Sequence, residues 1–181
     1  MSSRTAALVI ERLGAQIAPA DVDELVTLFI ECVDGGASMG YLAPLSVPEA
    51  AAFWRPIIGD LGAGQRILIV ARDAPGGRIV GSAQLKGESR PNGRHRAEVQ
   101  KVMVRPSHRR RGLGTQLMGY LEAAARERGV RLLFLDTSEG PGGARELYER
   151  LDYRYAGGIP GGALDPDGTP AKNAIFYKVL D

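Results

Sequence analysis

The sequence predicts an α+β fold with a mixed, mostly antiparallel central sheet flanked by helices. Three strand-like runs, residues 66–72, 78–86 and 96–104, follow one another directly and are joined by short turns rich in glycine and proline. This pattern is typical of an antiparallel meander. The last of these runs is followed by a leucine-striped helix and a further apolar strand at 131–137, which is typical of a single strand–helix–strand crossover.

The N-terminal third is expected to supply one strand and two helices. Residues 5–13 form an apolar run that predicts the first strand, and residues 20–33 place apolar side chains at helical spacing after two aspartates. The glycine pair in the segment 34–41 ends this helix. A second helix begins at residues 46–49, where a capping serine, an early proline and a glutamate three residues after the cap coincide, and it fades near Gly62.

The C-terminal half continues with a helix over residues 112–128, the strand 131–137 and a short helix over 142–151. Residues 157–172 are rich in glycine and proline and predict a loop, and residues 173–180 predict the final strand. The expected order is strand, helix, helix, three strands, helix, strand, helix and two strands, without an internal repeat or a linker.

Composition limits the classes of function. The 181 residues form one expected domain, 1–181, with 44% apolar residues, 24% charged residues and a net charge of +2, so no global field requires a nucleic acid or a membrane. The chain has no apolar run long enough for a membrane span or a signal peptide, so we expect a cytoplasmic protein. Its single cysteine, Cys32, lies in an apolar pattern and is expected to be buried and inert. Two histidines and one cysteine show no metal-ligand spacing.

The most informative stretch is VMVRPSHRRRGLGTQLM, residues 102–118, in which a strand ends, three arginines follow and a helix begins after a Gly-Leu-Gly step. A helix N-terminus offers unpaired N–H groups and partial positive charge, which suits a phosphate. Gly112 and Gly114 would let phosphate oxygens approach the backbone, and the arginines add fixed charge. The alternative is a solvated glycine-rich turn.

Other phosphate-binding motifs fit this stretch poorly. The P-loop pattern GxxxxGK followed by Ser or Thr is absent. A dinucleotide fingerprint would need a third glycine where Leu117 stands, and the preceding meander does not suit a doubly wound parallel sheet. A nucleic-acid patch would need aromatic residues among the arginines.

The stretch resembles the Q/R-x-x-G-x-G/A signature of the Gcn5-related N-acetyltransferases, with Arg-Arg-Arg-Gly-Leu-Gly at residues 109–114. The same setting surrounds it: the strand end VMV, a V-x-P step, the leucine-striped helix, RLLFLDT and A-x-x-x-Y, together covering residues 96–153. Within that family, DGGASMGY, RPNG, RAEVQKVMV and LDT resemble acetyltransferases of the tabtoxin-resistance type.

The resemblance implies that this turn cradles the pyrophosphate of acetyl-CoA and that the end of strand 96–104 binds its pantetheine arm. It also implies direct transfer of acetyl from acetyl-CoA to an amine, with the backbone N–H of Met103 facing the thioester oxygen. The residues implied to bind the cofactor are Val102, Met103, Val104, Arg109, Arg110, Arg111, Gly112, Leu113, Gly114 and Thr115.

Acetyl transfer makes demands that can be stated independently. An alkyl ammonium is neutral in only about one part in a thousand near pH 7.4, so a proton must leave before attack. The developing oxyanion needs a donor, and the departing thiolate gains from an acid. Glu98 stands where some family members place a general base, and Asp136 is a second candidate. Glu98 could instead be an ordinary solvent-facing strand glutamate or one paired with Arg96 or Lys101, and Asp136 could cap the turn into the following helix.

Tyr148 stands four residues after Ala144, as in the family pattern A-x-x-x-Y, whose tyrosine protonates the thiolate; the alternative is a half-buried core tyrosine. Two positions depart from the family. Pro141 replaces a usual asparagine, and Asp152-Tyr153 replaces a usual Gly-Phe. Of the two histidines, His95 adjoins a turn and is expected at the surface, and the other, beside the arginines, is expected to meet phosphate or solvent.

The predicted function is therefore an N-acetyltransferase acting on a small-molecule amine, such as an amino acid or a β-lactam antibiotic. The alternatives are a protein or peptide N-acetyltransferase and a non-catalytic CoA sensor. The acceptor pocket is expected to be bordered by residues 34–41, 90–96 and 157–172. A homodimer is left open by the sequence.

Overall fold

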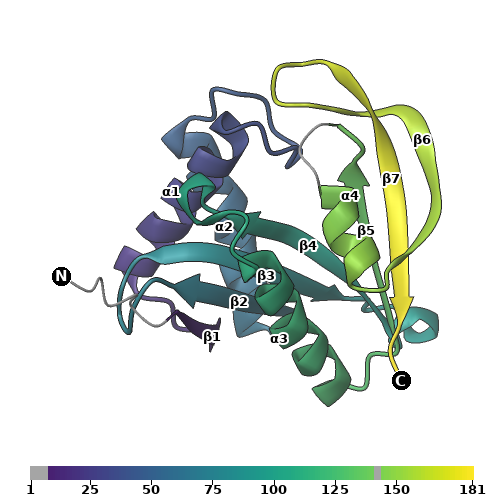
Figure 1. The fold of residues 1–181 in the computed structure, drawn as a ribbon. Helices are drawn as coiled ribbons and strands as arrows, with labels where there is room; N and C mark the ends of the chain where they lie inside the picture. The colour runs from purple at the N-terminus through teal and green to yellow at the C-terminus, as the bar shows by residue number, and fades with distance from the viewer. Residues whose placement is uncertain (1–7, 141–143) are drawn as a thin grey trace.

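The computed structural model describes residues 8–140 and 144–181 and has a mixed sheet at its centre (Figure 1). Its seven strands run in the order β1-β2-β3-β4-β5-β7-β6, and only β4 and β5 are parallel neighbours. The strands are β1 (Val9–Leu13), β2 (Arg66–Arg72), β3 (Ile79–Gly87), β4 (Arg96–Val104), β5 (Leu132–Ser138), β6 (Arg154–Leu164) and β7 (Pro170–Val179). The helices are α1 (Pro19–Asp34), α2 (Val47–Gly62), α3 (Leu113–Glu127) and α4 (Ala144–Arg150). The predicted fold class is confirmed.

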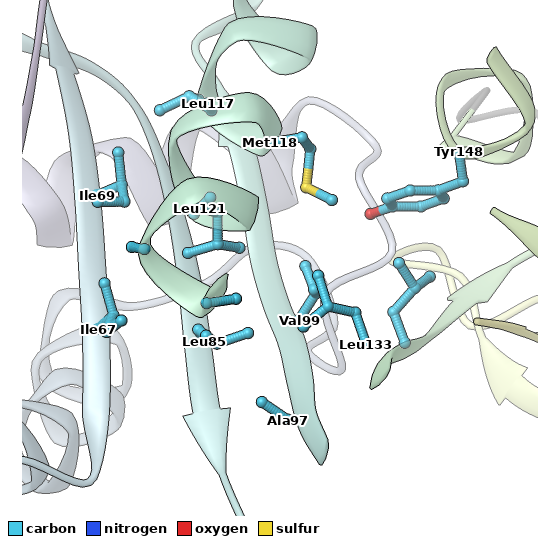
Figure 2. Packing of buried hydrophobic residues seen from close by; sticks show 14 of the residues in the cluster. Ile67, Ile69, Leu85, Ala97, Val99, Leu117, Met118, Leu121, Leu133 and Tyr148 are labelled. Carbon is cyan, nitrogen blue, oxygen red and sulfur yellow. The ribbon is translucent and has the colours of Figure 1, made fainter. Parts of the chain in front are cut away.

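Alternation along the strands divides the core into two layers. In β2, Ile67 and Ile69 face α3, whereas Leu68 and Val70 face α1 and α2. Figure 2 shows the first layer, in which Leu117 and Leu121 of α3 project toward the sheet. Because helices cover both faces at β2, this strand reads as a continuous apolar run.

The starts of the helices follow the expected chemistry. The amide of Glu49 donates to Ser46 Oγ at 3.4 Å, and the amide of Ser46 donates to the Glu49 carboxylate at 3.2 Å, so the predicted capping box is present. The indole of Trp54 in α2 donates to the carbonyl of Leu25 in α1 at 3.1 Å, which ties the two helices together.

One predicted loop is a strand. Residues 157–164 of this segment belong to β6, and residues 170–172 are the first three residues of β7. Strand β6 pairs with β7 from Arg154 opposite Tyr177 to Leu164 opposite Pro170. Two register shifts in β6 accommodate glycines that sequence reasoning assigned to a loop. As an edge strand, β6 also tolerates Pro160. The predicted residues 5–7 and 141–143, Pro141 included, lie outside the described part of the chain.

Candidate active site

A gap between the two parallel strands creates the site. Strands β4 and β5 pair only from Arg96 to Glu98 and from Leu132 to Phe134. Beyond this point β4 stays with β3, while β5 pairs with β7 through Ser138. A register shift against β3 lies next to Lys101, whose φ of 47° is in the left-handed region. Such a bulge bends the strand, so β4 leaves β5 and backbone groups are exposed in the gap.

The gap forms part of a cleft of about 1170 Å³. Its walls come from the α1–α2 loop, β4, the turn before α3, the end of β5, α4 and β6. Of the predicted site residues, those that line it are Glu98, Val102, Val104, Arg109, Arg110, Gly112, Leu113, Gly114, Thr115, Asp136 and Tyr148. Met103 and Arg111 are not among the residues that line it.

The turn before α3 combines positive charge with an open helix N-terminus. Gly112 is the N-cap residue of α3 with a φ of 74°, and no side chain caps the first turn. The free N–H groups of that turn and the guanidinium groups of Arg109 and Arg110 fit a phosphate-bearing ligand. The Nε of Arg109 also donates to the carbonyl of Val104 at 3.2 Å, which fixes the turn against β4.

The two glycines of this turn have different structural reasons. A Cβ added at Gly112 would meet no atom within 4 Å, so its positive φ is what favours glycine there. A Cβ at Gly114 would lie 3.3 Å from Leu147 Cδ2, so this glycine allows α4 to approach α3. Close helix approach, in addition to ligand access, therefore accounts for the Gly-Leu-Gly step.

The end of β4 presents backbone groups to the gap. The amide of Arg105 donates to the carbonyl of Val80 at 2.9 Å, and Met103 lies opposite Ser82. The alternation of an antiparallel ladder then turns the N–H of Met103 toward β3 and the N–H of Val104 toward the gap. Because the side chain of Met103 is fully buried under α1 and α2, a backbone donor for a ligand is better sought at Val104.

Two carboxylates lie at the other end of the cleft. Glu98 is the last residue of β4 that pairs with β5, and Asp136 lies two residues beyond its partner Phe134 on β5. The neighbouring Arg96 pairs with Glu88 at 3.3 Å, and no described ion pair involves Glu98. In the amide orientation that satisfies its neighbours, Asn173 donates to Asp136 Oδ2 at 3.2 Å. Glu98 and Asp136 are therefore both free to face a ligand.

Tyr148 borders the cleft from α4. Its side chain is only 6% exposed, and its ring lies 5.8 Å from that of Tyr153 and 6.0 Å from that of Phe176. Figure 2 shows the ring directed from α4 toward the sheet and Met118. Burial raises the pKa of Tyr148 above its usual range, and the negative charge of Asp136 adds to this effect. A tyrosine is protonated at neutral pH even with its ordinary pKa, and burial adds to this preference for the neutral form.

The α1–α2 loop covers the carboxylate end of the cleft. The amide of Ala43 donates to the carbonyl of Pro166 at 2.9 Å, and Ser38 Oγ donates to the carbonyl of Leu164 at 3.5 Å. These bonds connect the loop to the β6–β7 hairpin. Of the three predicted borders, 34–41 and 157–172 contribute residues to the cleft, whereas none of residues 90–96 lines it. Within that segment, Arg96 lies over Phe134, with its guanidinium carbon 5.8 Å from the ring centre.

Lys101 and Cys32 also line the cleft, although neither was expected to bind a ligand or take part in catalysis. The sequence RAEVQKVMV, residues 96–104, contains a pattern that indicates the bulge at Lys101. The α3-facing apolar positions step by two from Ala97 to Val99, by three to Val102 and by two to Val104. That change of phase marks a bulge. Cys32 is buried as predicted, and burial raises the pKa of its thiol, which agrees with an inert cysteine.

The two histidines lie outside the centre of the cleft. Ser107 Oγ and Nδ1 of His108 are 2.9 Å apart beside the turn, and His108 lines the cleft, whereas His95 does not. Within residues 8–140 and 144–181, no cluster of three or more His, Cys, Asp or Glu side chains could hold a metal ion. The described helices include none that is long and apolar enough to cross a membrane.

Comparisons with known proteins agree with this geometry. The chain is 32% identical to an uncharacterized N-acetyltransferase of Azospirillum brasilense over 134 residues, 73% of this chain and 76% of that protein. It is 25% identical to the L-methionine sulfoximine/L-methionine sulfone acetyltransferase of Pseudomonas aeruginosa, over 78% of this chain and 79% of that protein. The fold is similar to yncA from Salmonella typhimurium, solved with its cofactor acetyl-CoA, with a TM-score of 0.75, 18% identity and coverage of 97% and 95% of the two chains. The model of the acetyltransferase (GNAT) family matches residues 39–153, and the chain belongs to this family of N-acetyltransferases.

Proposed function

We propose that this protein transfers acetyl from acetyl-CoA directly to the amine of a small molecule. The observation that carries the proposal is the single cleft, which joins the open N-terminus of α3 to the carboxylates of Glu98 and Asp136 through the gap between β4 and β5. A phosphate-binding end and a proton-accepting end are both needed for transfer from a CoA thioester to an amine.

The turn end would hold acetyl-CoA. The free N–H groups of α3, together with Arg109 and Arg110, would bind the pyrophosphate. The N–H of Val104, which faces the gap, would donate to a carbonyl of the pantetheine arm, as a strand does to an added neighbour. Bound acetyl-CoA would supply the activated acetyl group in the gap where β4 and β5 part.

At the other end of the cleft, a carboxylate would bind the ammonium of the acceptor and remove its proton. An amine arrives mostly as an ammonium, so a nearby carboxylate must hold this cation and accept its proton, directly or through water. We assign this role first to Glu98, because it lies where the strands part, and second to Asp136.

Tyr148 would protonate the departing thiolate. It borders the cleft from the face of the sheet opposite to that of α1 and α2, and its hydroxyl, like that of any tyrosine, carries a proton at neutral pH. A proton donor beside the leaving thiolate assists its departure, and the neutral thiol is a poorer nucleophile for the reverse reaction than the thiolate.

The covered acceptor end favours a small molecule over a protein tail. The bonds from Ala43 and Ser38 to the β6–β7 hairpin restrict the opening that a peptide chain would need. The relative from Pseudomonas aeruginosa is described as acting on L-methionine sulfoximine and L-methionine sulfone, which are small amino-acid derivatives. An acceptor of this kind, antibiotic-like compounds included, is therefore the first class to test.

The test is thiol release from acetyl-CoA across a panel of amines. The panel contains amino acids, L-methionine sulfone, a tabtoxinine-like β-lactam, polyamines, aminoglycosides and peptide N-termini. Turnover with a small amine supports the proposal. Binding of acetyl-CoA without turnover of any amine would instead support a CoA sensor, and turnover confined to peptides would support a peptide N-acetyltransferase.

A further inference from the structure

Lys101 has a backbone conformation that a lysine adopts at a cost. Its φ of 47° lies in the left-handed region, within the bulge that separates β4 from β5. Glycine adopts this conformation without strain, whereas a residue with a side chain loses about 1 kcal/mol or more. The presence of a lysine at this point indicates that its side chain has a use that offsets the strain.

The ammonium of Lys101 is held in the cleft with incomplete hydrogen bonding. Its Nζ donates to the carbonyl of Met39 at 2.7 Å and lies 5.5 Å from the ring centre of Phe53. An ammonium has three N–H donors, and no other described residue accepts from this one. The bond to Met39 fixes its position on the α1–α2 loop, and two donors remain.

No described carboxylate forms a direct ion pair with Lys101. Asp136 and Glu98 both act on it electrostatically, yet no described carboxylate forms an ion pair with it within 4.0 Å, and Arg66 opposes its charge. Burial is the largest effect and lowers the pKa of Lys101. A half-buried ammonium with free donors is stabilised when an anionic oxygen reaches it.

We propose that Lys101 is the specificity-determining residue of the acceptor end and that it binds an anionic oxygen carried by the acceptor. The ammonium of the acceptor would face Glu98 and Asp136, and its carboxylate would face Lys101. The preferred class is then an amine with a carboxylate close by, as in a free amino acid. Acceptors with a second cation, such as polyamines, are disfavoured. This inference rests on the proposed function of the cleft.

Matched pairs of acceptors test the proposal. L-methionine, L-leucine and L-methionine sulfone are each compared with their carboxamides, which keep the shape and lose the charge. Values of kcat/KM are expressed per neutral amine, because the amine of an amide loses its proton more readily. The wild-type protein should prefer the carboxylate by about ten- to hundredfold, the range expected for hydrogen bonds to a charged group.

Three variants separate specificity from a structural role. Lys101→Met should lower kcat/KM for the carboxylate member and leave the amide member little changed, so the ratio approaches one. Lys101→Arg should restore most of the preference. Lys86→Met is the matched control, because Lys86 is an exposed lysine opposite Glu98 on β3 and does not line the cleft. It should leave the ratio unchanged.

Several results would overturn the proposal: a wild-type preference for the amide, an equal loss for both members in Lys101→Met, or the same loss of ratio in Lys86→Met. If no amine is acetylated, the proposed function fails, and binding still tests Lys101. NMR titration of the CoA-loaded protein with N-acetyl-L-methionine and with its amide needs no turnover. Equal affinities contradict the proposal, and a carboxylate preference that disappears in Lys101→Met supports it.

Discussion

Tyr148 is the residue that would act as the acid in acetyl transfer. The rings of Tyr153 and Phe176 bury it, and its pKa is raised as a result. Tyr148→Phe should therefore lower kcat by about ten- to hundredfold, because the thiolate loses its acid, with little change in the affinity for acetyl-CoA. Steady-state kinetics and calorimetric binding of acetyl-CoA measure the two quantities.

Tyr153→Phe is the control for this change. Tyr153 is buried beside Tyr148, but it does not line the cleft. Its loss should leave kcat unchanged. Equal turnover in wild type and Tyr148→Phe would remove the acid role from Tyr148.

Glu98 gives a second prediction at the residue scale. Glu98→Gln keeps the size of the side chain and removes its ability to accept a proton, so kcat/KM for the amine should fall by about a hundredfold or more. The dependence of the rate on pH should change with it. Asp136→Asn is compared under the same conditions. A pH–rate profile unaltered in Glu98→Gln and altered in Asp136→Asn would transfer the role to Asp136.

At the scale of elements, α3 both packs against α4 and opens its N-terminus to the cleft. Gly114→Ala would place a Cβ 3.3 Å from Leu147 Cδ2, so α4 must shift by a few tenths of an ångström. We expect the KM for acetyl-CoA to rise a few-fold, because the first turn of α3 binds the ligand. The KM is measured from initial rates at saturating acceptor.

Gly119→Ala is the matched change in the same helix. A Cβ at Gly119 meets no atom within 4 Å, and alanine is the better helix former. The free energy of unfolding, measured with urea, should increase by about 0.5–1 kcal/mol, with the KM for acetyl-CoA unchanged. Equal effects of the two substitutions on KM would mean that contact between α3 and α4 does not position the turn.

At the scale of the whole molecule, Arg105 joins the α1 layer to the sheet. It is 2% exposed, donates to the carbonyl of Ile79 at 2.8 Å and pairs with Glu24 at 2.8 Å and with Glu31. Arg105→Met leaves these partly buried acceptors without their donor, so the free energy of unfolding should fall by about 2–4 kcal/mol.

Arg78 provides the comparison. It lies 3.9 Å from the same two carboxylates, but its side chain is 61% exposed. Arg78→Met should change the free energy of unfolding by less than about 1 kcal/mol. Similar losses in the two variants would show that burial of Arg105 is not the cause.

The sequence predicted the order of the elements because their signals are local. The capping box at Ser46, the meander and the leucine stripe each depend on neighbouring residues. The expected order ended in two strands, but residues 157–164 of β6 were assigned to a loop, because the pairing with β7 that outweighs the loop preference of their glycines is not a local signal. The α1–α2 loop covers the cleft because it contacts the β6–β7 hairpin, for example through the bond between Ala43 and Pro166. These segments are more than 100 residues apart, so no local pattern predicts the contact.

The central claim is direct transfer within one cleft, and a single-turnover experiment tests it. Protein in excess is mixed with acetyl-CoA and an amine that is turned over, and intact-mass spectrometry follows the acetyl group. The account predicts that the acetylated amine appears together with free CoA while the mass of the protein stays unchanged. Acetyl found on the protein before it appears on the amine would contradict the account.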